Sequence, residues 1–142
     1  MKQALEAEDM KFELKTDRGY ELVFDARSFD SKEWLDSYSI SLSSPNMKGA
    51  VRVCNHPYGT SPHEFFNSIA RDWKGWSGEK SWGSLDGEFD LTAESDRTGH
   101  ISIRARIFEG HNPPSAQLET RLILEAGQCE NVAKEATKFF LK

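Results

Sequence analysis

The chain has few cysteines and no long apolar run. Cys54 and Cys129 are its two cysteines, too few for the disulfide framework of a small secreted domain, so we interpret both as free thiols. No apolar run approaches the ~20 residues that span a bilayer, and the amino terminus lacks the apolar stretch of a secretory signal. These absences favour a cytoplasmic protein without membrane contact, although a chain whose signal had been removed would look the same.

Basic residues are also scarce relative to acidic ones. The chain has 18 Lys and Arg against 23 Asp and Glu, a net charge of −5. Residues 1–36 carry ten acids and six bases, whereas residues 37–63 carry no acid at all. An acidic balance argues against the phosphate-neutralising surface that nucleic-acid binding requires. It fits a basic protein partner better.

The sequence lacks the recognised motifs of catalysis. We find no glycine-rich phosphate loop, no nucleophile elbow and no helix with two zinc-binding histidines. Four residues within an eleven-residue stretch offer metal donors: Cys54, His56, His63 and Glu64. The donor types suit zinc but the spacing matches no common pattern, so we favour a buried cysteine beside loop histidines. We therefore expect no enzyme, no metal and no cofactor.

What is present indicates one α+β domain over residues 1–142, with residues 1–9 a candidate disordered acidic tail. Apolar residues alternate with polar ones in seven segments, which predicts strands with one wet and one dry face. The glycines of Thr16-Asp17-Arg18-Gly19 and Asp96-Arg97-Thr98-Gly99 are placed to close two hairpins. In the second hairpin, Glu88 and Asp90 run against Arg104 and Arg106, so opposite charges are expected to pair across the strands.

Two helices interrupt the strands. Ser61-Pro62-His63-Glu64 reads as a capping box with proline at the first helical position. Apolar residues at Phe65, Ile69 and Trp73 follow on one helical face, so Trp73 is expected in the core, and Gly75 is placed to end the helix. A second helix after Gly127 presents Val132, Ala133, Ala136, Phe139 and Phe140.

The resulting order is four strands, helix, three strands, helix. Strands joined in runs favour an antiparallel arrangement. We expect one mainly antiparallel sheet of about seven strands with both helices packed on its dry face.

The most distinctive segment carries three of the four tryptophans, Trp73, Trp76 and Trp82, among glycines. Trp76 and Trp82 are either buried structural residues or exposed anchors, since tryptophan is enriched at binding hot spots. His100 follows the second hairpin turn and would need an orienting carboxylate to act in catalysis. The candidate partner- or ligand-binding residues are Trp76, Glu79, Trp82, Asp86 and His100.

A family resemblance rests on three motifs. They are Trp73-Lys74-Gly75-Trp76-Ser77-Gly78-Glu79-Lys80-Ser81-Trp82, then Gly99-His100, then Glu125-Ala126-Gly127-Gln128 before a closing helix. With them the chain resembles, over residues 10–142, a family of small bacterial domains, mostly of unknown function, some of which are grouped with WapI-type immunity proteins. The chain departs from the pattern at Pro113-Pro114-Ser115, where an aromatic residue is expected. The family implies no catalytic residues.

The resemblance implies a non-enzymatic protein that binds and neutralises a toxin. Acidic patches would steer it toward a basic toxin; the candidates are Glu79, Asp86, Glu88 and Asp90, and, in the first hairpin, Glu13, Glu21 and Asp25. The alternative from the residues is a small-molecule-binding domain with a cup formed by Trp76, Trp82 and His100. We expect a monomer or a weak homodimer, the latter if Phe108, Ile123 and Val23 form one exposed strip.

Overall fold

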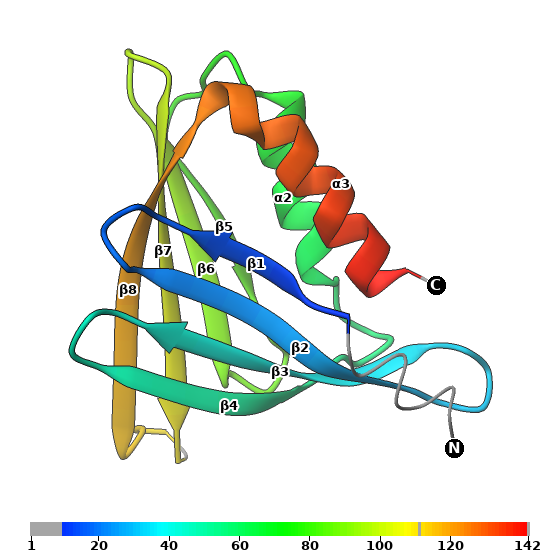
Figure 1. Ribbon diagram of the computed structural model, residues 1–142. Helices are drawn as coiled ribbons and strands as arrows, with labels where there is room; N and C mark the ends of the chain where they lie inside the picture. The colour runs from blue at the N-terminus through cyan, green and yellow to red at the C-terminus, as the bar shows by residue number, and fades with distance from the viewer. Residues whose placement is uncertain (1–9, 111, 142) are drawn as a thin grey trace.

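The structure is a computed structural model that describes residues 10–110 and 112–141. The candidate tail at residues 1–9 lies outside the described residues. The described chain forms eight strands, a short 3-10 turn η1 and two helices (Figure 1). In chain order these are β1 Phe12–Lys15, β2 Glu21–Phe29, β3 Leu35–Ser43, β4 Lys48–Cys54, α2 Pro62–Arg71, β5 Glu79–Gly83, β6 Phe89–Ser95, β7 His100–Glu109, β8 Ala116–Glu125, η1 Ala126–Gln128 and α3 Cys129–Phe140.

The antiparallel α+β class is confirmed, but the single seven-strand sheet is wrong. The strands form two four-stranded sheets, β1-β2-β3-β4 and β5-β6-β7-β8, so each half of the chain is four strands followed by a helix. The eighth strand is β5, within the segment rich in tryptophan and glycine. It pairs with β6 from Glu79↔Glu94 to Gly83↔Asp90. Its five residues are three polar residues, one tryptophan and one glycine. They do not alternate between apolar and polar, so the sequence pattern does not predict this strand.

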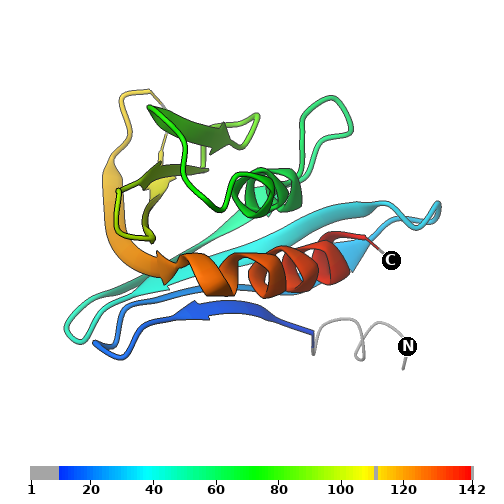
Figure 2. The ribbon, with the colours of Figure 1, turned by 90° about the horizontal axis from the view of Figure 1, so that it is seen from above.

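The two sheets lie crosswise and the helices close the space between them. In Figure 1, β5–β8 run nearly vertically behind β1–β4, and the sheets touch where β3 and β4 contact β7. Gly49 of β4 marks this junction, because a Cβ there would meet Leu118 at 3.0 Å and Ile107 at 3.3 Å. Seen from above, α2 and α3 lie side by side, α3 over β1 and α2 toward β5 (Figure 2). The helices therefore cover both inner sheet faces rather than one.

Phe24 of β2 lies at the centre of the core. Its ring lies 5.6 Å from Phe89 of the second sheet, 6.4 Å from Phe66 of α2 and 5.5 Å from Phe140 of α3 (centroid distances). Phe24 itself is fully buried. One side chain thus contacts both sheets and both helices, and aromatic pairs of this kind contribute ~0.5–1.5 kcal/mol beyond the burial of apolar area.

Helix α2 begins as predicted but is capped differently. Pro62 occupies the first turn, yet the Ser61 side chain makes no capping bond and instead donates to Asn55 Oδ1 at 3.2 Å. The predicted capping box is therefore absent here. A capping box does form at η1, between Glu125 and Gln128.

Trp73 is not a core residue. Helix α2 ends at Arg71 with Asp72 as its C-cap, so Trp73 leaves the helical face on which the sequence placed it and is 49 % exposed. Gly75 does adopt a positive φ of 122°, four residues beyond the last helical residue. The apolar spacing thus extends further than the helix.

The hairpin expectations are largely confirmed. Gly19 and Gly99 take positive φ angles of 87° and 86° in their turns. Asp90 pairs with Arg106 in register, and the guanidinium donates two hydrogen bonds of 2.9 and 2.8 Å to the carboxylate. The second predicted charge pair is wrong, because the Glu88 carboxylate accepts from the Ser84 hydroxyl at 2.6 Å and Arg104 lies opposite Thr92.

The expected apolar strip does not form on one face. Phe108 and Ile123 lie on the outer face of the second sheet, whereas Val23 belongs to the first. The homodimer remains a prediction. Across the described part of the chain, no helix is both long and apolar enough to cross a membrane.

Candidate functional site

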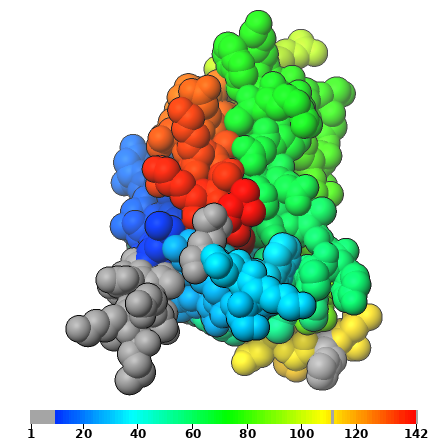
Figure 3. All heavy atoms as spheres, turned by 90° about the vertical axis from the view of Figure 1, so that its right-hand side faces the viewer, coloured from blue at the N-terminus to red at the C-terminus, as the bar shows by residue number. Residues whose placement is uncertain are grey.

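Three turns that are distant in sequence meet at one end of the molecule. They are residues 30–36, which lead from β2 into the start of β3, residues 54–60, which begin with the last residue of β4, and residues 84–88 between β5 and β6. We call them together the three-turn surface. The first two lie side by side on the face shown in Figure 3, coloured cyan and bluish green. The Trp34 indole NH donates to the Asn55 carbonyl at 2.8 Å, and His56 joins this pair to the third turn.

Asn55 holds the first two turns rigidly together. It is 6 % exposed, its side-chain amide donates to the Leu35 carbonyl at 2.8 Å, and its backbone NH donates to the Asp36 carbonyl at 2.8 Å. Its side-chain oxygen accepts from Ser61. A buried amide whose nitrogen and oxygen both form hydrogen bonds fixes the backbone on either side of it, which here means Cys54 and His56.

The third turn is fixed by Ser84 and Gly87. The Gly87 NH donates to the Ser84 carbonyl at 3.0 Å, and Ser84 NH donates to the Phe89 carbonyl at 2.9 Å. Gly87 adopts a φ of 81°, a conformation that side chains rarely tolerate. Asp86 projects from this closed turn.

Cys54, His56 and Asp86 come together on the three-turn surface. The Cys54 sulfur, a His56 ring nitrogen and an Asp86 carboxylate oxygen all lie within 4.8 Å of one another. His56 Nε2 is 2.9 Å from Asp86 Oδ2. Cys54 and His56 share a direction because residues two apart on an extended chain point the same way, and Asn55 between them points into the protein.

The surface also exposes large apolar side chains among acids. Tyr58 is 91 % exposed, Leu85 61 % and Trp34 37 %. Beside them is a hollow of about 600 Å³ that is lined by side chains including Trp34, Cys54, His56 and Pro57. The acids at this end include Asp30 and Asp36, which line the same hollow, and Asp86.

The expectation of a buried cysteine at Cys54 is wrong, because Cys54 is exposed. The other metal donors considered in the sequence do not join this cluster. His63 and Glu64 lie in the first turn of α2, where the His63 ring stacks on Phe140 at 6.0 Å. Burial lowers the pKa of His63, opposed by Glu64. Asp86, 30 residues beyond His56, takes their place, which local spacing in the sequence cannot reveal.

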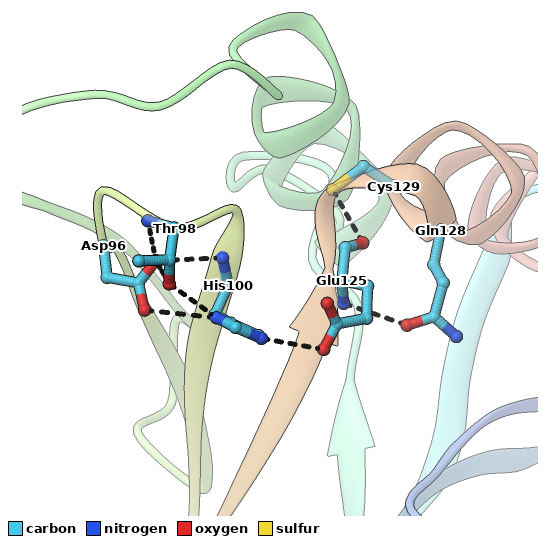
Figure 4. A network of polar contacts seen from close by, with 6 residues as sticks. All are labelled: Asp96, Thr98, His100, Glu125, Gln128 and Cys129. Atoms are coloured by element: carbon cyan, nitrogen blue, oxygen red, sulfur yellow. Dashed lines mark hydrogen bonds and ion pairs between the residues drawn. The ribbon is translucent and has the colours of Figure 1, made fainter.

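His100 is held by two acidic residues at the far end of the second sheet (Figure 4). Its Nδ1 is 2.8 Å from the Thr98 hydroxyl and 3.4 Å from Asp96 Oδ2, and its Nε2 is 3.3 Å from Glu125 Oε2. Backbone hydrogen bonds from His100 and Thr98 lower the pKa of Asp96. With both ring nitrogens engaged, the imidazole fastens the β6–β7 turn to the end of β8.

The tryptophans and His100 do not converge on a cup. Trp82 pairs with Leu91, which lies on the buried face of the second sheet, whereas His100 pairs with exposed Glu125 on its outer face. The two side chains therefore project from opposite faces. Trp82 donates its indole NH to the Thr60 carbonyl at 2.8 Å and packs on Phe89.

Trp76 and Glu79 lie near the opposite end of β5. Trp76 is partly buried against the core, and the Lys80 ammonium lies 4.9 Å from its ring centroid. Lys80 also binds Asp72 at 2.7 Å, and this hydrogen bond lowers the pKa of Asp72. Glu79 is exposed at the first position of β5. Of the five candidate residues, only Asp86 belongs to the three-turn surface.

The fold and this surface define a two-sheet α+β domain with a rigid end that presents Cys, His, Asp and exposed aromatic side chains. The sequence model of a family of unknown function, DUF6228, matches residues 13–142, and the chain belongs to that family. No curated protein and no solved structure matches the chain.

Proposed function

We propose that the protein is a non-enzymatic protein-binding domain that recognises a basic partner through the three-turn surface. In its most specific form, the partner is a bacterial toxin and the chain its cytoplasmic immunity protein, as the resemblance to WapI-type proteins implies. The single observation that carries the proposal is the exposure of Trp34, Tyr58 and Leu85 on three mutually fastened turns with acids beside them.

The composition of this surface supports recognition of a protein. Binding energy at interfaces is concentrated in a few aromatic anchors surrounded by polar groups that exclude water. Tyr58 supplies such an anchor with little loss of conformational entropy on binding, because it has only two rotatable side-chain bonds. The hydrogen bonds of Asn55 and Ser84 hold the backbone of the turns, so little ordering cost is expected on association.

The charge of the surface supports a basic partner. Asp30, Asp36 and Asp86 are exposed at this end, where they outnumber the exposed Lys32, and the whole chain carries a net charge of −5. Complementary charge accelerates encounter, more strongly at low ionic strength. A neutraliser of a toxin gains from a fast association rate, because it must capture the toxin before the toxin acts.

Co-expression with neighbouring reading frames of the source genome tests the proposal. Each frame is expressed in a test bacterium with and without this protein. We expect one frame to be toxic, to be neutralised by this chain and to co-purify with it in a one-to-one, salt-sensitive complex. Absence of toxicity, or rescue without a complex, would contradict the immunity role.

A second candidate function is small-molecule binding in the hollow beside Trp34. Its volume of about 600 Å³ lies within the usual range of ligand pockets. A ligand that protects the Trp34 indole from quenching, without any protein partner, would favour this candidate over the first.

A further inference from the structure

We propose that Cys54, His56 and Asp86 form a binding site for a zinc-class divalent cation. The three donors come from the end of β4, the loop that follows it and the β5–β6 turn. The proposal concerns metal binding by the chain alone and stands independently of any protein partner.

The donor set matches the chemistry of zinc. Thiolate, imidazole and carboxylate are the three kinds of side chain that bind Zn²⁺ in proteins, at about 2.0–2.3 Å. In a tetrahedral site, donors at those distances lie about 3.3–3.6 Å apart. The three donor atoms here lie within 4.8 Å of one another, so small side-chain rotations bring them to a common ion. A cation would take the place of the 2.9 Å contact between His56 and Asp86.

The backbone on both sides of the site is already fixed. Asn55 lies between the two donors on β4 and its loop, and its amide donates to the Leu35 carbonyl. The turn that carries Asp86 is closed by Ser84 and Gly87. A preorganised donor set loses little entropy on binding, which is the condition for a tight metal site.

One further carboxylate beside the donors favours a bound cation. The Glu88 carboxylate lies 3.5 Å from the Cys54 backbone NH and accepts from Ser84. Arg52, a cation nearby in the sequence, does not bind the donors. Its guanidinium donates instead to the Ala26 carbonyl and to the Ser37 and Ser39 hydroxyls.

The same setting disfavours Cys54 as a nucleophile. A reactive thiolate needs an electropositive environment, which Asp86 and Glu88 do not provide. Metal binding displaces the thiol proton to solvent and supplies the compensating charge. Three protein donors leave a fourth position for water, as in open zinc sites.

Cobalt substitution of the full chain tests the site directly. The purified protein, stripped with a chelator under reducing conditions, is titrated with Co²⁺ and then with Zn²⁺ in competition with a chromophoric chelator. We expect one equivalent of Co²⁺ to give a thiolate-to-cobalt charge-transfer band, which Zn²⁺ abolishes. Cys54→Ser should remove the band and weaken Zn²⁺ binding at least about 100-fold, more than the loss of an outer-shell partner does.

The second cysteine provides a matched control. Cys129 is 1 % exposed and its thiol donates toward the Glu125 carbonyl, so Cys129→Ala should leave both the band and the affinity unchanged. Asp86→Asn and His56→Gln should each weaken binding at least about tenfold, while circular dichroism confirms that all variants are folded. A missing charge-transfer band, or one that survives Cys54→Ser, would overturn the proposal. Zn²⁺ affinity unaffected by Asp86→Asn and His56→Gln would overturn it equally.

Discussion

His56 Nε2 and Asp86 Oδ2 lie 2.9 Å apart although 30 residues separate them in the chain. The contact fastens the loop after the first sheet to a turn of the second, on the side of the molecule away from His100. Together with the hydrogen bond from Trp34 to the Asn55 carbonyl, it joins three separate connections into one surface. Both proposals depend on this contact between the turns. The protein-binding proposal needs it to bring the exposed Tyr58 and Leu85 onto one surface, and the metal-binding proposal needs it to bring the donor atoms together.

The first prediction concerns the central ring of the core. Phe24→Ala should lower the free energy of unfolding by about 3–5 kcal/mol, because it leaves a cavity facing both sheets and both helices. Phe24→Leu should cost less, since it refills most of the volume. Tyr20→Ala, at a position 37 % exposed, is the control and should cost under about 1 kcal/mol. Urea denaturation measures all three, and equal losses for Phe24→Ala and Tyr20→Ala would contradict the packing described.

The second prediction concerns pH and His63. Burial lowers the pKa of His63 below its usual 6.5, so the unfolded chain binds this proton more readily than the folded one. Its contribution to stability is therefore constant above pH 6.5 and declines as the pH falls below 6.5 toward the folded pKa. Asp72 and Asp96, whose pKa values are lowered from 3.8, act only at more acidic pH.

Urea denaturation at pH 7.5 and 5.5 isolates this contribution. The loss of stability between the two pH values should be smaller in His63→Leu than in the parent chain. His100→Gln serves as the comparison on an exposed histidine. An identical decline in His63→Leu and the parent would show that His63 does not titrate in this way.

The third prediction concerns the Asp90–Arg106 pair. The two side chains are 27 % and 31 % exposed and meet through two parallel hydrogen bonds. A double-mutant cycle with alanine should give a coupling of about 0.5–1 kcal/mol. Because the cycle subtracts the effect of each single substitution, the separate contact of Arg106 with the Phe108 ring does not contribute to the coupling energy.

The exposed Glu13–Lys15 pair, 3.5 Å apart, is the reference for that cycle. Its coupling should be close to zero, because exposed ions remain hydrated. Equal couplings for the two pairs would argue against the in-register bidentate contact.

Much of the fold could be predicted from local patterns. Apolar residues at every second position predict one buried face of each strand, and Phe89, Leu91, Ile101 and Ile103, which follow this spacing, are all buried. Glycines with positive φ marked the hairpin turns because few other residues adopt that conformation. These features depend on nearest neighbours in the chain, and sequence spacing records them.

What the sequence could not reveal depends on distant contacts. The division into two sheets follows from β4 and β5 not pairing, which no local pattern encodes. Ser61 faces both a helix NH and the buried Asn55 side chain, and the tertiary partner takes its hydroxyl. Trp73 follows the helical spacing of Phe65 and Ile69, which predicts a core position, but helix α2 ends at Arg71, before Trp73.

The candidate site was recovered only in part. Cys54 and His56 could be noticed from their spacing and Asp86 from its charge, but nothing in the sequence joined them. The composition of the tryptophan segment indicated candidate binding residues, yet Trp82 packs against the core and the Trp76 ring contacts the Lys80 ammonium. Exposed Tyr58 lies in a loop with no distinctive motif, so its role depends on the contacts between the three turns.

The affinity of the Tyr58→Ala variant for the partner identified by co-expression tests the central claim most directly. Tyr20→Ala, an exposed turn tyrosine outside the three-turn surface, is the matched control, and isothermal titration at two salt concentrations is the measurement. We predict that Tyr58→Ala weakens binding at least about tenfold, a loss typical of an interface anchor, while Tyr20→Ala binds as the parent does. Unchanged affinity for Tyr58→Ala, or an equal loss in both variants, would contradict the assignment of the three-turn surface as the binding site.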